Sequence, residues 1–127
     1  LEQTIEPNQH EVYAEVGSNI LLSCNYSSAN SLLWYKQSPG SAPQYLLLIL
    51  HSAGIEQRAD SLDSRISGIL NKEKTRVDLD ITSAEETDSA LYYCALIRDA
   101  GTKIIFGRGT RLLVLSRERH EPYATQA

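Results

Sequence analysis

Two cysteines and one tryptophan constrain the fold of this chain more than any other feature. Cys24 lies ten residues before Trp34, the only tryptophan, and Cys94 follows sixty residues after it. Two thiols in a chain of this size are as often free and buried as bonded. In a two-sheet β-sandwich, however, this order and spacing would let a disulfide tie one sheet to the other while the tryptophan packs against it. Closing a loop of about 70 residues would stabilise such a fold by roughly 4 kcal/mol.

Short runs of alternating apolar residues predict β-strands along most of the chain. In the clearest run, Val77, Leu79 and Ile81 are predicted to face the core, and Asp78 and Asp80 to lie in water. The other predicted strands cover residues 20–24, 32–37, 44–50, 55–58, 65–69, 91–96 and 103–115. No helical pattern is longer than a turn or two. The prediction is therefore an all-β sandwich or barrel.

Framework motifs surround the cysteines and the tryptophan. In Asp88-Ser89-Ala90-Leu91-Tyr92-Tyr93-Cys94, Tyr92 has the position of a tyrosine corner, whose hydroxyl bonds to upstream backbone. With Trp34-Tyr35-Lys36-Gln37, Pro39-Gly40 and Arg65-Ile66-Ser67-Gly68, the sequence resembles the variable domains of antigen receptors over residues 1–115. The resemblance implies an immunoglobulin V-set β-sandwich with Greek-key connections and one inter-sheet disulfide. It also implies a salt bridge between Arg65 and Asp88, which as an isolated pair would be taken for two solvated charges.

The sixty residues between Trp34 and Cys94 indicate which type of sandwich this is. They leave room for extra strands near residues 44–50 and 55–58. Such strands separate the nine-stranded variable type from the seven-stranded constant type. About nine strands are therefore expected.

A joining-like segment follows the second cysteine. Phe106-Gly107-Arg108-Gly109-Thr110-Arg111-Leu112 matches the pattern Phe-Gly-x-Gly-Thr-x-Leu of rearranging receptors. Its glycines can take backbone conformations that bulge an edge strand, and in the family this bulge lets two variable domains pack face to face. A dinucleotide-binding motif is excluded, because the third glycine position is leucine and no helix follows.

The family's ligand-binding loops correspond to residues 26–31, 51–55 and 96–104. Recognition concentrates in such loops because a rigid scaffold tolerates their variation. The candidate contact residues are Tyr26, Asn30, His51, Ile97, Arg98, Asp99 and Lys103. Arg98 is the best single candidate, since arginine is over-represented among interface hot spots. The alternative is that Arg98 and Asp99 form a solvated pair.

A second candidate surface lies on the outer face of one sheet. The positions through which variable domains pair in the family are here Tyr35, Gln37, Pro43, Tyr45, Tyr93 and Phe106. The domain's own loops could bury these aromatics in part. Four aromatics on one exposed face would nevertheless be unusually apolar for a monomer. We therefore predict a dimer, either a homodimer or a heterodimer of two variable domains.

Composition and motif searches exclude several other functions. The net charge of −4 and the isoelectric point near 5.3 argue against a nucleic-acid partner. The three histidines, His10, His51 and His120, have no metal-ligand spacing with the cysteines. No Gly-x-Ser-x-Gly or comparable nucleophile motif occurs. We predict a binding protein with no enzymatic activity, no cofactor and no metal.

Three features favour an extracellular location. Asn25-Tyr26-Ser27 is a glycosylation acceptor, which is used only in the secretory pathway. The chain opens at Leu1, as a processed ectodomain would, and its longest apolar run, residues 45–50, is too short to span a membrane. We expect a receptor ectodomain on the extracellular side of the plasma membrane, with any anchor beyond Ala127.

The motifs leave two receptor families open. Residues 74–81 and 95–96 look like the variable domain of a T-cell receptor alpha or delta chain, which recognises peptide on a histocompatibility molecule. The other family is the novel immune-type receptors of bony fish, innate receptors that bind protein ligands on other cells. Residues 116–127 are polar and are predicted to form a stalk or linker without the start of a constant domain, which favours the innate receptor. A V-type adhesion domain that binds through its sheet face is a further alternative.

Overall fold

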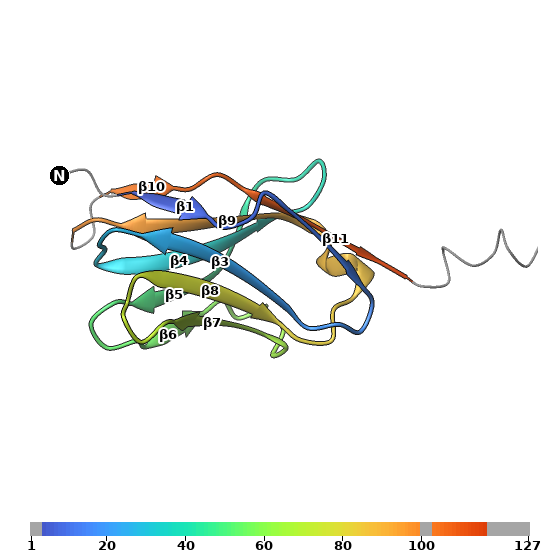
Figure 1. The fold of residues 1–127 in the computed structure, drawn as a ribbon, viewed down its shortest axis with the longest axis horizontal. Coiled ribbons are helices and arrows are strands. Elements are labelled where there is room, and N and C mark those ends of the chain that lie inside the picture. Colours follow the sequence, from blue (N-terminus) through green and yellow to red (C-terminus); the bar gives the residue numbers. More distant parts are fainter. Residues whose placement is uncertain (1–3, 100–102, 117–127) are drawn as a thin grey trace, which may run out of the picture.

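Eleven strands in two packed sheets make up the described part of the chain, residues 4–99 and 103–116, in this computed structural model (Figure 1). The four-stranded sheet has the order β1 (Ile5–Pro7), β3 (Ile20–Tyr26), β8 (Arg76–Ile81), β7 (Ile66–Leu70). The seven-stranded sheet has the order β2 (Glu11–Glu15), β11 (Thr110–Leu115), β9 (Ala90–Ile97), β4 (Ser31–Gln37), β5 (Gln44–Leu50), β6 (Glu56–Arg58), and β10 (Ile104–Phe106) also pairs with β9. The predicted all-β sandwich with Greek-key connections is confirmed.

The described chain has eleven strands where about nine were expected, because the first and the last strand are each divided in two. At the N-terminal end, β1 pairs antiparallel with β3 of one sheet, and β2 pairs parallel with β11 of the other. Neither strand is predicted above. At the other end, the single strand expected over residues 103–115 is divided into β10 and β11. One terminal strand can thus add hydrogen bonds to both sheets, because it crosses from one to the other.

The break between β10 and β11 contains the two glycines of the joining-like segment. Neither glycine has a positive φ. Instead, a Cβ at Gly107 would lie 3.0 Å from the Cys94 sulfur and 3.0 Å from the Ile5 carbonyl oxygen. A Cβ at Gly109 would lie 2.7 Å from a methyl group of Leu91. The missing side chains thus allow close packing here, most clearly at Gly107, whose neighbours are the disulfide and backbone.

The core lies between the sheets and contains the predicted frame. Cys24 of β3 and Cys94 of β9 form a disulfide that joins the two sheets, as expected. Trp34 is opposite Cys94 in the register of β4 and β9 and has no exposed surface. Aliphatic side chains from both sheets fill the rest of this cluster; the largest fully buried ones are Leu22, Leu32, Leu47, Ile49, Leu79, Ile81, Leu96 and Leu112.

The prediction that Asp78 lies in water is wrong. Its side chain points to the outer face of the four-stranded sheet, yet only 4% of the residue is exposed. The Ser23 hydroxyl donates a hydrogen bond to Asp78 Oδ1 at 2.7 Å, and the Arg76 guanidinium donates to both carboxylate oxygens, at 2.9 and 3.2 Å. These hydrogen bonds raise the pKa of Arg76. Asp78 is covered because β8 is an inner strand, flanked on both sides by side chains of β3 and β7.

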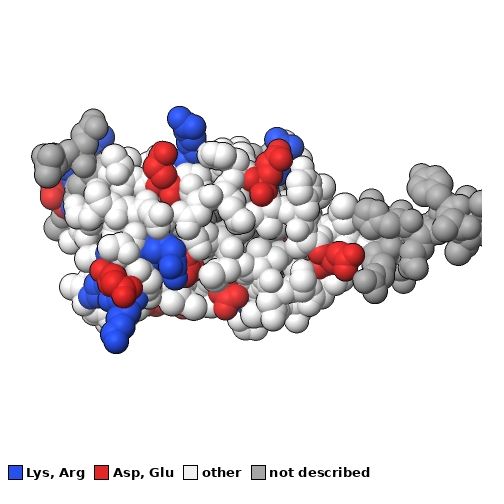
Figure 2. Space-filling view, viewed as in Figure 1, with Lys and Arg blue, Asp and Glu red and all other residues white. Residues whose placement is uncertain are grey.

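The two ends of the sandwich carry different elements. The 3₁₀ turn η1 (Glu86–Asp88) lies at the opposite end from β10 (Figure 1). On the face drawn in Figure 2, acidic and basic side chains are interspersed among uncharged ones. No helix among the described residues is long and apolar enough to cross a membrane. The linker predicted for residues 116–127 falls, apart from Ser116, outside the described residues.

Candidate functional site

Three loops meet at one end of the sandwich and are joined there by backbone hydrogen bonds. The loops follow β3, β5 and β9 and cover residues 27–30 and 51–55 and, in the third loop, residues 98–99 and 103; residues 100–102 of the predicted third loop lie outside the described residues. The Asn30 amide donates to the Ile97 carbonyl at 2.8 Å, and the Asn30 carbonyl accepts from the His51 amide at 3.1 Å. The backbone of Asn30 therefore links the first loop to the bases of the other two. The result is one contiguous surface built from three distant segments.

Two further contacts hold the second and third loops. The Arg98 amide donates to the Lys103 carbonyl at 3.3 Å, which closes the base of the third loop. The Lys74 ammonium donates to the Ser52 carbonyl at 3.0 Å and so ties the second loop to the turn between β7 and β8. Lys74 has a left-handed backbone, with φ of 58°. Nothing in the sequence pattern pointed to Lys74, because its contact is made to a backbone group.

The predicted contact residues differ in their accessibility. Asn30, Arg98, Asp99 and Lys103 are exposed, and His51 and Ile97 are half-buried. Tyr26 is only 6% exposed, so its side chain supports the loops and does not lie on their surface. It shares the inward face of β3 with Cys24 and packs edge-on against the His51 ring at 5.7 Å between centroids. The strand's alternation, extended by two residues beyond Cys24, was the signal that could have placed it.

The aromatic residues predicted for pairing gather on the outer face of the seven-stranded sheet. The Tyr35 ring lies 5.2 Å from the Phe106 ring and 6.0 Å from the Tyr45 ring, and Tyr93 lies 6.5 Å from Phe106. Phe106 is 50% exposed, whereas the three tyrosines are half-buried. We call these four residues the aromatic face. Their ring contacts join residues of β4, β5, β9 and β10.

The polar groups beside the aromatic face are engaged within the chain. The Tyr93 hydroxyl donates to Gln37 Oε1 at 3.1 Å, and Gln37 Nε2 donates to the Ser41 carbonyl at 3.0 Å. The Tyr45 hydroxyl donates to the Gln57 carbonyl at 2.9 Å, and burial raises the pKa of Tyr45. Pro43 is exposed at the rim. The face therefore offers apolar ring surface with few unpaired polar groups.

The end opposite the loops holds the predicted ion pair. The Arg65 guanidinium donates to both carboxylate oxygens of Asp88 at 3.1 Å, and to the carbonyls of Thr82 and Ser83 at 2.9 and 3.1 Å. The Asp88 side chain is 4% exposed and the Arg65 side chain 19%. The bidentate bond to Asp88 raises the pKa of Arg65. These bonds join the segment before β7 to the loop between β8 and β9.

Tyr92 completes this end. Its hydroxyl donates to the Asp88 carbonyl at 2.6 Å, the geometry predicted for a tyrosine corner. Tyr92 has no exposed surface, and burial raises the pKa of its hydroxyl. The backbone of η1 is thereby fixed to β9.

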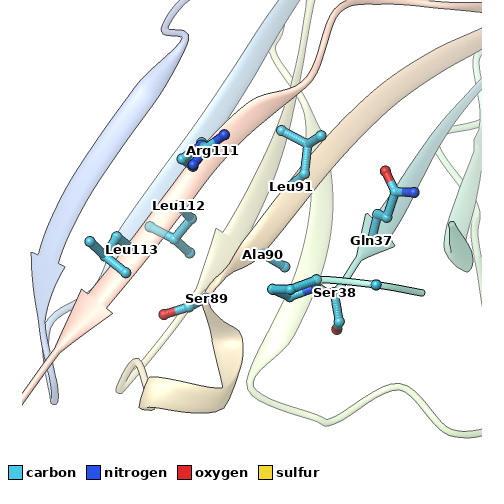
Figure 3. A pocket seen from close by; sticks show the side chains of 10 residues that line it. Gln37, Ser38, Ser89, Ala90, Leu91, Arg111, Leu112 and Leu113 are labelled. Carbon is cyan, nitrogen blue, oxygen red and sulfur yellow. The ribbon is translucent and has the colours of Figure 1, made fainter. Parts of the chain in front are cut away.

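A surface hollow of about 340 Å³ lies near the same end (Figure 3). Side chains from β11, from the start of β9 and from the turn after β4 line it, and most of them are aliphatic or small. Gln37 and Arg111 are its long polar side chains, and its lining holds no acid, histidine or cysteine. Within residues 4–99 and 103–116, no group of three or more His, Cys, Asp or Glu side chains could hold a metal ion.

Sequence comparisons agree with this arrangement of a disulfide-linked sandwich and three loops. The family of the Immunoglobulin V-set domain matches residues 7–115. The chain belongs to the immunoglobulin V-set family. It is an antigen-receptor-type variable domain, since its relatives include variable regions of T-cell receptor alpha chains.

Two V-set relatives show how far this likeness extends. The chain is 32% identical to the T-cell receptor alpha chain V region 2B4 of Mus musculus, over 89% of this chain and 84% of the relative. It is also 32% identical to T cell receptor alpha chain MC.7.G5 of Homo sapiens, over 88% of this chain. It spans only 40% of the length of that human chain.

Proposed function

We propose that this V-set domain is the ligand-recognition module of an immune cell-surface receptor and binds a protein on another cell through its three-loop end. The observation that carries the proposal is the junction at Asn30, which holds three loops as one surface. Exposed Arg98, Asp99 and Lys103 supply charges of both signs there. Such charges, set on a rigid platform, suit recognition of a protein surface more than of a small apolar ligand.

We further propose that the aromatic face pairs two variable domains. Half-exposed Phe106 stands among three tyrosines, and the neighbouring Gln37 amide is already engaged. Ring surface of this kind is enriched in the cores of protein interfaces. Either a second copy of this chain or a different variable domain can pack against such a face.

The type of receptor has two candidates. Relatives named as T-cell receptor alpha chains support an alpha-type domain that recognises peptide on a histocompatibility molecule and pairs with a second chain. The joining-like segment Phe106–Leu112 is equally compatible with an innate novel immune-type receptor. The exon structure of the gene that encodes this chain distinguishes the two receptor types. A joining-like segment encoded in the same exon as the domain would exclude somatic rearrangement and leave the innate receptor.

Binding of the tetramerised domain to a panel of cell lines tests the loop surface. Arg98→Ala and His51→Ala are expected to lower cell staining at least tenfold, whereas Arg111→Ala, an exposed arginine on β11 away from the loops, should leave it unchanged. If both loop variants stain every cell line as the parent does, the loop proposal fails. Loss of staining on Tyr93→Arg alone would instead favour an adhesion domain that binds through its sheet.

Sedimentation of the purified domain tests pairing with itself. A homodimer predicts association at tens of micromolar that Tyr93→Arg abolishes. A monomeric parent at that concentration rules out the homodimer and leaves pairing with a different chain.

A further inference from the structure

The glycosylation acceptor lies on a face that neither proposed binding surface uses. Asn25 is exposed near the end of β3, and its neighbours in the register are Glu6 on β1 and Arg76 on β8. Cys24 and Tyr26, on either side of it, point into the core. The Asn25 side chain therefore stands on the outer face of the four-stranded sheet, on the other side of the sandwich from the aromatic face.

The same outer face exposes two large aliphatic side chains. Leu21 is 50% exposed and Ile69 47%. Leu21 lies on β3 four residues before Asn25, and Ile69 lies on β7 opposite Asp78. Strand β8, which carries the hydrogen-bonded Arg76–Asp78 pair, lies between β3 and β7.

We propose that Asn25 carries an N-linked glycan and that this glycan covers the outer face of the four-stranded sheet, including Leu21 and Ile69. Four residues of strand span about 13 Å, a distance that an oligosaccharide of several sugars covers. Attached glycans are bulky and solubilising. The modification thus leaves the aromatic face, on the other side of the sandwich, uncovered. Whether Asn25 is glycosylated does not depend on the recognition function proposed for the three-loop end.

The chemistry of the attachment fits this segment. The amide nitrogen of Asn25 attacks the anomeric carbon of an oligosaccharide carried on a polyprenyl pyrophosphate. A carbon–nitrogen bond forms, the sugar–pyrophosphate bond breaks with its electron pair leaving on the lipid pyrophosphate, and one amide proton is lost to solvent. The acceptor's third position is Ser27, whose hydroxyl oxygen in the folded domain accepts a hydrogen bond from the Thr4 amide at 3.0 Å. Asn25-Tyr26-Ser27 is the only such tripeptide in the sequence.

Secretion of the domain from a eukaryotic cell line tests the attachment. The intact mass of the parent should show one glycan, which a peptide N-glycosidase removes. The control Asn8→Gln, which changes an exposed asparagine outside the tripeptide, should carry the same glycan. Asn25→Gln and Ser27→Ala should both lack it. Secreted parent protein that folds with its disulfide but carries no glycan would overturn the proposal.

A second measurement tests what the glycan covers. All variants carry Tyr93→Arg, so that association through the aromatic face does not contribute. Asn25→Gln is expected to self-associate at concentrations at least fivefold lower than the glycosylated protein, and adding Leu21→Ser with Ile69→Ser should reverse this. Equal self-association with and without the glycan would overturn the shielding role even where the glycan is present. Neither result depends on cell staining, so failure here is distinguishable from failure of the recognition proposal.

Discussion

The two ends of this V-set sandwich are held together by different kinds of interaction. At the loop end, backbone groups of Asn30, Ile97 and His51 make the connections between loops. At the opposite end, specific side chains make them, with Arg65 and Tyr92 both bonded to Asp88. Backbone groups are offered by almost every residue type, so loop sequence can vary without loss of the junction. The side-chain end has no such freedom, because its charges are buried.

Two buried tyrosines make the contrast measurable. The Tyr92 hydroxyl at the side-chain end has a partner at 2.6 Å. The Tyr26 hydroxyl at the loop end is buried with no hydrogen-bond partner among the described residues. Removing the hydroxyl should therefore lower the free energy of unfolding at Tyr92 but not at Tyr26. The following variants test whether stability and recognition are separated in this way.

The largest effect is expected from Asp88→Ala. The substitution leaves the Arg65 guanidinium largely buried without its bidentate partner and removes the acceptor of the Glu85 amide. Loss of one partner from a buried pair should lower the free energy of unfolding by about 3 kcal/mol. Urea unfolding of the oxidised protein, followed by Trp34 fluorescence, measures it.

Asp63→Ala is the matched control for this variant. Asp63 also contacts Arg65, at 3.3 Å, but its side chain is 49% exposed. An exposed pair of this kind is screened by solvent and contributes little to stability, so a much smaller loss is expected. Equal losses from Asp63→Ala and Asp88→Ala would contradict the role given to burial.

Tyr92→Phe is expected to have the second largest effect. It removes the hydrogen bond to the buried Asp88 carbonyl and should cost about 1–2 kcal/mol. Because burial raises the pKa of Tyr92 above its ordinary value of 10.0, only the neutral hydroxyl stabilises the fold. This contribution is complete below pH 10.0 and is lost as the pH rises above it.

Unfolding at pH 8 and above pH 10 therefore checks the sign of the Tyr92 effect. The difference in stability between parent and Tyr92→Phe should shrink at the higher pH. Tyr13→Phe, at a residue 66% exposed, serves as the control and should change stability by less than about 0.5 kcal/mol at either pH. A difference that grows with pH would show that the hydroxyl ionises more readily in the fold than in the unfolded chain.

Sequence predicted the core frame and the side-chain end better than the loop end. Cys24, Trp34, Cys94 and Tyr92 were predictable because their roles require particular side chains at fixed spacings. The junction at Asn30 and the Lys74 contact were not, because backbone acceptors leave no trace in residue type. Asp78 shows a further limit. Alternation predicts which face a side chain points to, but its burial on that face depends on neighbours in adjacent strands.

At the loop end, Tyr26→Phe tests the unpartnered hydroxyl. A buried hydroxyl without a partner costs its desolvation free energy, so its removal should leave stability unchanged or raise it by up to about 1 kcal/mol. The ring and its contact with His51 are retained. The same urea titration gives the answer, and a loss as large as that of Tyr92→Phe would contradict the contrast between the two tyrosines.

The smallest effect on stability is expected from Arg98→Ala. Arg98 is exposed, and its backbone amide, which bonds to Lys103, is kept in the variant. Surface substitutions of this kind change the free energy of unfolding by less than about 0.5 kcal/mol. Measured beside the cell-staining assay, this variant separates recognition from folding at one position. Staining should fall while the urea midpoint stays within error of the parent. A shifted midpoint would mean that the Arg98 side chain helps to hold the loop, and that the loop end also depends on side chains for its stability.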